Sequence, residues 1–139
     1  MRLLITEPTA VVVEHADVAS LRAEDESGGF GILDGHADFL TVLTPSVLAW
    51  RHVDGRFGYC AVRQGVLSVQ GGSEVAIATR QAQLGTNLDT LERAVIDRFV
   101  AEDEAERSAR VAATRLHMQA IRRIIAALRP EQAQLGAAP

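Results

Sequence analysis

Glycine and proline divide this 139-residue sequence into two parts. Ten of the eleven glycines lie at or before position 85, and positions 86–129 contain neither glycine nor proline. Because these two residues interrupt helices and mark turns, the first part favours short strands and the second favours helix. We therefore predict a β domain over residues 1–86 and a helical domain over residues 87–139, with a frayed tail from residue 130.

The first part consists of short apolar runs separated by turn residues. Several runs alternate between two faces, as strands do: Leu48, Trp50 and His52 share one side of their run, as Val75 and Ile77 do of theirs. About ten such strands with tight turns predict a β-sandwich or a flattened barrel. The runs with strand composition are 2–5, 10–15, 18–23, 29–32, 40–43, 47–53, 56–63, 66–69 and 74–78.

The second part has the periodicity of an amphipathic helix. A side-chain oxygen of Thr86 or Asn87 can cap its start by accepting free backbone N–H groups. Apolar residues then recur every three or four positions, except in the stretch 101–110, which is nearly all charged or small. That stretch allows two helices with a turn near residues 102–108, or one long helix that bends there, because it holds no strong helix breaker.

The charges of the helical part are segregated. Residues 87–106 hold seven acidic residues and two arginines, a net charge of −5, whereas residues 107–129 hold six arginines and no acidic residue, a net charge of +6. In an antiparallel hairpin the halves would attract each other, whereas an extended form would offer a basic amphipathic face to an acidic partner. A third interpretation is that both are solvated faces whose charges complement the helix dipole.

Composition excludes several classes of function. The chain contains no lysine, so it cannot use a P-loop or Schiff-base lysine, and its net charge of −4 argues against a nucleic-acid partner. No apolar run reaches the roughly 18 residues that a membrane-spanning helix needs. The first residues also lack the apolar core of a signal peptide, so we expect a cytosolic protein.

No constellation of residues predicts an enzyme. The four histidines are scattered along the chain. The only tight cluster of potential metal ligands is His36-Ala37-Asp38, so we expect no metal site. The single cysteine, Cys60, lies in a predicted strand and is interpreted as a small buried hydrophobe rather than a nucleophile. The glycines at 28–31 precede no helix start, which excludes a dinucleotide-binding loop. We expect no catalytic residue and no cofactor.

The segment Gly31–Leu43 resembles the signature of the epsilon subunit of F-type ATP synthases, which typically reads G-I-L-P-G-H-A-P-L-L-T-x-L. Asp34 and Asp38 stand where that family usually has proline. The later segments Gly65–Gln70 and Val75–Ala78 also resemble the family, in the same order. The residues shared in the first segment include Gly31, Ile32, Gly35, His36, Ala37, Leu40 and Thr41.

This resemblance implies a ten-stranded β-sandwich followed by a two-helix domain, in a noncatalytic subunit of a rotary stalk. The sandwich would bind the gamma subunit and the ring of c subunits. The helices would regulate ATP hydrolysis by switching between a folded hairpin and an extended form that enters the head of alpha and beta subunits. The resemblance implies an interface with gamma and the c ring at Gly31, Asp34, Gly35, His36 and Asp38.

The resemblance also implies a role for the basic helix and a location. Arg115, Arg122 and Arg123 would meet acidic surface of the beta subunits. The complex would lie at the cytoplasmic face of the bacterial inner membrane, and this chain would associate with the membrane only through the complex.

Several bacterial members of the family bind ATP through an [IL]-D-x-x-R-A motif at the start of the helices. Here the run is Leu88-Asp89-Thr90-Leu91-Glu92-Arg93-Ala94, with the arginine one residue further along. Each residue turns an α-helix by about 100°, which moves Arg93 to another side. We therefore expect Asp89 and Arg93 to pair with each other at (i, i+4) and ATP binding to be weak or absent.

Two further hypotheses concern subgroup and function. The runs 22–28 and 50–55 resemble the alternate, N-type subgroup of these ATP synthases, in which the c subunit sets whether the coupling ion is a proton or sodium. The competing hypothesis is an unrelated β-sandwich adaptor that docks an acidic protein partner through its basic helix.

Overall fold

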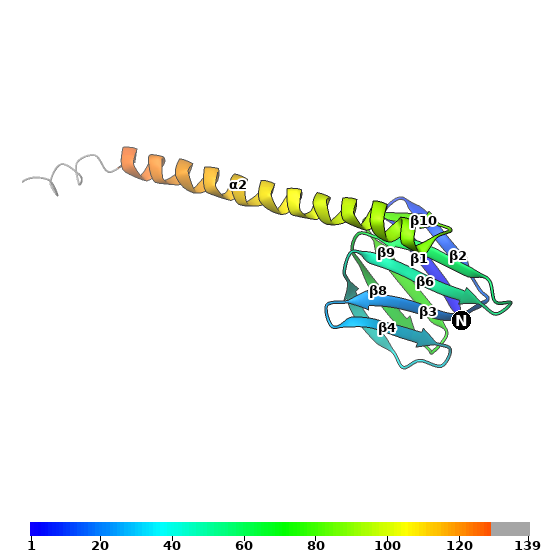
Figure 1. Ribbon diagram of the computed structural model, residues 1–139. Helices are drawn as coiled ribbons and strands as arrows, with labels where there is room; N and C mark the ends of the chain where they lie inside the picture. The colour runs from blue at the N-terminus through cyan, green and yellow to red at the C-terminus, as the bar shows by residue number, and fades with distance from the viewer. Residues whose placement is uncertain (129–139) are drawn as a thin grey trace, which may run out of the picture. The chain divides into compact units, whose positions relative to one another are not determined.

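The computed structural model describes residues 1–128 as ten strands followed by helix (Figure 1). The predicted tail from residue 130 lies outside the described residues. The chain divides into two compact units, Met1–Ala101 and a second that begins at Glu102. The elements are β1 (Arg2–Glu7), β2 (Ala10–His15), β3 (Val18–Asp25), β4 (Gly28–Leu33), β5 (Phe39–Leu43), β6 (Ser46–His52), β7 (Phe57–Val62), β8 (Gly65–Gln70), β9 (Glu74–Thr79), β10 (Ala82–Gly85), α1 (Leu88–Thr90), the π-helical segment η1 (Leu91–Ile96) and α2 (Asp97–Leu128).

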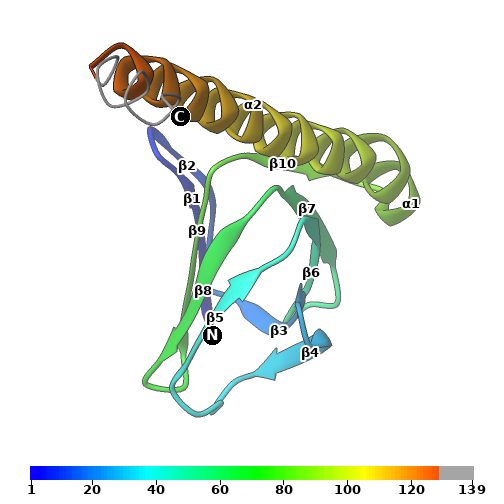
Figure 2. The same cartoon turned by 90° about the vertical axis from the view of Figure 1, so that its left-hand side faces the viewer.

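The ten strands form two layers that face each other (Figure 2). Neighbouring strands pair in the order β10-β7-β6-β3-β5-β8-β9-β1-β2, and β4 pairs with β3. β3 meets β5 only where Asp25 lies opposite Leu43, so the strands divide there into sheet one (β10, β7, β6, β3, β4) and sheet two (β5, β8, β9, β1, β2). β1 and β9 are the one parallel pair among the described strands, and their pairing places the N-terminal strand inside sheet two.

The core lies between the two sheets and is filled by alternate residues of each strand. In sheet two, Ile77 of β9 lies opposite Leu67 of β8, and both are buried. In sheet one, Leu48, Trp50 and His52 are all buried, which confirms the prediction that they share one side. Removing this apolar surface from water is the main term that stabilises the fold.

The predicted class, a β-sandwich of about ten strands followed by helix, is confirmed. Each of the nine predicted runs matches a strand whose ends lie within two residues of the predicted ones. β10 is absent from the predicted runs because its sequence, Ala-Gln-Leu-Gly, is short and half polar. Cys60 of β7 is buried as predicted, and burial raises the pKa of its thiol to about 12, which keeps it protonated and unreactive.

The helical part begins at the predicted cap and continues without a turn. The side-chain oxygen of Asn87 accepts hydrogen bonds from the backbone N–H groups of Asp89, at 2.9 Å, and Thr90, at 3.4 Å. α1 leads directly into η1, and η1 into α2. The prediction of two helices is wrong for the described residues, because α2 runs unbroken through residues 102–108. That stretch holds good helix formers and no breaker, so the reversal of charge does not end the helix.

The first helical turns pack on the outer face of sheet one. Leu91, Val95 and Phe99 are buried and form a small apolar core with Ala61 of β7. Each of these residues follows the previous one by four positions. Four residues of an α-helix turn through about 400°, so each side chain would be rotated about 40° relative to the one before it. The wider i→i+5 turns of η1 reduce that drift, so the π segment keeps the three side chains aligned on the sheet.

We predict that Phe99→Ala loosens these turns without unfolding the sandwich. The substitution leaves a cavity at a fully buried site, which lowers the free energy of local opening by about 3 kcal/mol. Hydrogen exchange of the amides of residues 91–99 measures this free energy. Val100→Ala is the matched control, since Val100 is 40% exposed and its truncation should cost no more than about 0.5 kcal/mol. Equal effects of the two substitutions would contradict the packing described.

Candidate partner-binding surfaces

The outer face of sheet two carries a continuous row of uncharged side chains. The strand register aligns Val42 of β5, Val66 of β8, Ala78 of β9, Thr6 of β1 and Val11 of β2 side by side. Val42 is 64% exposed, Val11 60% and Val66 43%. Large apolar residues that are contiguous and exposed mark a surface that another molecule covers.

A second row of the same face runs parallel to the first. It aligns Leu40 of β5, Ser68 of β8, Ala76 of β9 and Leu4 of β1, and Leu40 is 71% exposed. We call the two rows together the apolar face. Its residues are Leu4, Thr6, Val11, Leu40, Val42, Val66, Ser68, Ala76 and Ala78.

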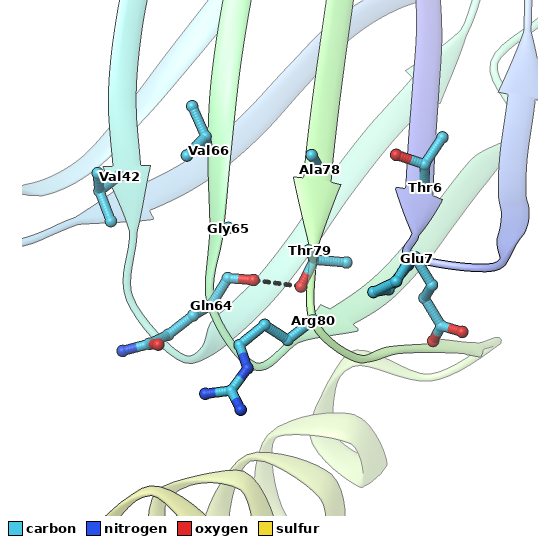
Figure 3. Close-up of a pocket in the computed structure, with 10 residues that line it drawn as sticks. Thr6, Glu7, Val42, Gln64, Gly65, Val66, Ala78, Thr79 and Arg80 are labelled. Atoms are coloured by element: carbon cyan, nitrogen blue, oxygen red, sulfur yellow. Dashed lines mark hydrogen bonds between the residues drawn. The ribbon is translucent and has the colours of Figure 1, made fainter.

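Charged residues border the apolar face rather than interrupt it. At one edge, Arg2 of β1 and Glu14 of β2 form an ion pair at 2.6 Å. At the opposite end of the strands, Glu7 and Arg80 lie beside a pocket of about 420 Å³ at the end of the first row (Figure 3). An uncharged centre with a polar border is the pattern of a protein–protein interface. The sequence analysis missed this surface, although the outward alternation of residues 40, 42 and 66 could have indicated it.

The predicted interface residues Asp34, Gly35, His36 and Asp38 lie in the loop between β4 and β5. The backbone N–H of Gly35 donates to the carbonyl of Gly72 at 2.8 Å, and the N–H of Gly71 donates to the carboxylate of Asp38 at 3.0 Å. The loop is therefore tied to the β8–β9 turn. Asp38 stands where the family usually has proline, and its carboxylate accepts one of these two hydrogen bonds. Gly31 is not part of this loop, since it lies within β4 opposite Arg22 of β3.

His36 is the half-buried member of that loop. Its Nδ1 lies 2.7 Å from the carbonyl oxygen of Ala37, so that nitrogen carries the proton and donates. The ring also lies 5.7 Å, between centroids, from the ring of Phe39, which contacts Phe30 at 5.6 Å. These contacts fix the orientation of the imidazole.

A second polar cluster lies at the same end of the sandwich, in the β2–β3 and β6–β7 turns. His52 Nδ1 lies 3.0 Å from the carboxylate of Asp17, and the Trp50 indole N–H donates to His52 Nε2 at 3.3 Å. The hydrogen bond to His52 is the main reason that the pKa of Asp17 lies below its ordinary value. Hydrogen bonds from Arg56 likewise lower the pKa of Asp54. Sequence reasoning missed this cluster, because its members lie up to 35 residues apart.

The predicted nucleotide-binding residues lie in α1 and η1. Within the described part of the chain no ion pair joins Asp89 to Arg93, so the expected (i, i+4) pair is not formed. The inference of a 100° rotation assumed an α-helix, whereas Arg93 lies in η1, whose turns hold one residue more. Weak or absent ATP binding stays a prediction.

The three predicted regulatory arginines lie on α2 and are exposed. Arg115 and Arg122 are seven residues apart, so they project from nearly the same side of the helix, and Arg123 projects about 100° away. Exposed apolar residues such as Leu116 and Ile124 accompany them. Among residues 1–128, no helix has the length and apolar character needed to cross a bilayer, and no three metal-ligating side chains converge.

We predict that Gly72→Ala destabilises the loop contact more than Gly71→Ala does. Both glycines have positive φ (+75° and +62°), so alanine costs about 1–2 kcal/mol at either position. At Gly72 a Cβ atom would also lie 3.0 Å from the Cα of Gly35, whereas at Gly71 it would meet nothing within 4 Å. The free energy of unfolding, measured in urea, should therefore fall further for Gly72→Ala than for Gly71→Ala. Indistinguishable values would show that the Gly35–Gly72 contact is not held.

Comparison with known proteins agrees with this fold. The family model described as "ATP synthase, Delta/Epsilon chain, beta-sandwich domain" matches residues 1–85. A protein of Paraburkholderia xenovorans named ATP synthase epsilon chain 2 is 47% identical over 132 residues, which cover 95% of both chains. A protein of the same name from Cereibacter sphaeroides is 45% identical over 125 residues, covering 90% of this chain and 86% of the relative.

Solved structures share the fold at lower sequence identity. A chain of the Euglena gracilis mitochondrial ATP synthase, in the assembly of OSCP, F1 and c ring, matches with a TM-score of 0.58 and 22% identity, over 76% of this chain and 62% of that chain. A chain of the Tetrahymena thermophila enzyme, from the central stalk and c ring, matches with a TM-score of 0.52 and 17% identity, over 60% and 65%. The family model and the two bacterial relatives together show that this chain belongs to the epsilon-chain family of F-type ATP synthases, as a noncatalytic subunit of that complex.

Proposed function

We propose that this chain joins the gamma subunit to the ring of c subunits in the central stalk, and that gamma docks on the apolar face. The observation that carries the proposal is the exposed row from Val42 to Val11 across five strands. Membership of the epsilon-chain family sets aside the unrelated adaptor. The N-type subgroup and a peripheral position at the cytoplasmic face of the bacterial inner membrane stay proposals.

A helical segment packs on the outer face of sheet one, whereas the apolar face of sheet two is exposed. Sheet one is partly covered by η1 and also presents charged residues such as Arg22 and Arg51. On sheet two, the apolar face has no charge in its interior and no helix packed on it within the unit Met1–Ala101. Burying Leu40, Val42 and Val66 against a partner would remove their exposed apolar surface from water, at roughly 25 cal/mol per Å².

The loop end of the sandwich is a second, separate surface. It carries Asp34, His36 and Asp38 on one side and the cluster around Asp17 and His52 on the other. Its polar groups are held by the hydrogen bonds described above, so they can meet a polar partner without first being ordered. We propose that this end meets the loops of the c subunits, while gamma occupies the apolar face. Two partners could then be bound at once, as a linker requires.

The gamma proposal is tested by Val42→Glu, titrated calorimetrically into a head complex of alpha, beta and gamma that lacks epsilon. A carboxylate buried in an apolar interface loses its hydration without gaining a partner, so we predict that affinity falls at least about tenfold. Val53→Glu is the matched control, because Val53 is also an exposed valine (75%) but lies off the apolar face. Equal loss in both variants, or in neither, would contradict the proposed docking surface.

We further propose that α2 regulates ATP hydrolysis by contact with acidic surface of the beta subunits. Its support is the exposed combination of Arg115, Arg122 and Arg123 with apolar residues on one helix. The charged side chains of residues 107–129 are all positive, which suits an acidic partner.

Replacing these three arginines together by alanine should raise the rate of ATP hydrolysis by the assembled complex severalfold, because an attractive contact that restrains the head is lost. Replacing them by lysine keeps the charges and should leave the rate near that of the unmodified complex. If the alanine variant hydrolyses ATP no faster than the lysine variant, the basic side of α2 is merely solvated.

A further inference from the structure

We propose that the pocket at the end of the apolar face is a socket for one apolar side chain of the gamma subunit. This inference rests on the proposed docking of gamma and adds the position of its anchor. The pocket has a volume of about 420 Å³ and lies among the ends of β1, β5, β8 and β9 (Figure 3). Its lining residues are Thr6, Glu7, Pro8, Val42, Gln64, Gly65, Val66, Ala78, Thr79 and Arg80.

The pocket exists because a small residue lies where neighbouring strands carry larger ones. Ala78 of β9 lies between Val66 and Thr6 in the first row of the apolar face, and its side chain is a single methyl group. Gly65 precedes Val66, and a Cβ atom there would lie 2.6 Å from the carbonyl oxygen of Ala78. Close packing of the two strands therefore requires glycine at 65.

The lining of the pocket is mainly apolar, and two of its polar side chains are already used within the fold. The Thr79 hydroxyl is hydrogen-bonded to the carbonyl of Gln64, and it lies 3.2 Å from the carbonyl of Gln81. One carboxylate oxygen of Glu7 accepts the backbone N–H of Ala82 at 2.7 Å. What the pocket offers an incoming group is therefore mainly the methyl groups of Val42, Val66 and Ala78. An apolar occupant matches them, because a polar one would lose water without replacing its hydrogen bonds.

Charged residues at the rim of the pocket lie around the position proposed for the apolar side chain of gamma. Glu7 and Arg80, of opposite sign, are the charged residues that line the pocket. The residues of gamma around the apolar anchor would therefore face this charged rim of the pocket. Such an arrangement, a desolvated anchor enclosed by a polar border, is typical of the few side chains that dominate the energy of an interface.

The test compares Ala78→Leu with Ala76→Leu in the titration against the head complex that lacks epsilon. Both alanines are exposed, lie on β9 and face the same way, but only Ala78 lines the pocket. Each leucine adds the same apolar bulk to the docking face. The leucine at 78 also projects into the pocket, so we expect the dissociation constant of the Ala78→Leu variant to rise at least about tenfold more than that of the Ala76→Leu variant. Urea midpoints of both variants, compared with the unmodified chain, check that the sandwich is intact.

A second pair of variants tests the socket by truncation. Val42→Ala removes a wall of the pocket, whereas Leu40→Ala removes a larger and more exposed side chain of the same strand that does not line it. The proposal predicts the greater loss of affinity for Val42→Ala. If the two variants of each pair lose the same affinity, the proposed socket is wrong, although gamma can still dock on the apolar face. If the unmodified chain does not bind the head complex, both the socket and the proposed function fail.

Discussion

The alternation of side chains along the strands of sheet two is the constraint on which the surfaces of this subunit depend. Burying Ile5, Ile77 and Leu67 between the sheets forces the residues beside them in the chain to point outward. Because the side-chain period of a strand is two, a slip of one residue would exchange the two sets completely. The exposed positions of Val66 and Ala78 are therefore a consequence of the same packing that stabilises the core.

The helix contact, the apolar face and the polar turns lie on different parts of the sandwich. The outer face of sheet one receives η1 through Leu91, Val95 and Phe99, and the outer face of sheet two is left apolar. The turns at one end gather hydrogen-bonded polar groups, from the Asp38–Gly71 tie to the Asp17–His52 pair. An apolar side and a polar end suit two different partners. This arrangement supports the proposal that the chain joins gamma to the ring of c subunits.

Sequence reasoning predicts the strands well because alternation and turn residues are local signals. It fails for the apolar face, since in runs such as Thr41-Val42-Leu43 both sides of the strand carry apolar residues, and alternation alone marks the two sides without saying which one is buried. It also fails for the Asp17–His52 pair, which is created by pairing of distant strands. The sequence also leaves open whether a turn or a continuous helix occupies residues 102–108, because charged and small residues do not by themselves end a helix.

The most direct test of the account is hydroxyl-radical footprinting of the chain alone and in complex with alpha, beta and gamma. This method reports the solvent exposure of individual side chains, and the chain carries large exposed apolar residues on both outer faces. The account predicts that Leu40, Val42 and Val66 become protected in the complex, while Leu33 and Val53 stay as reactive as in the free chain. Protection of Leu33 and Val53 with unchanged reactivity at Val42 and Val66 would contradict it.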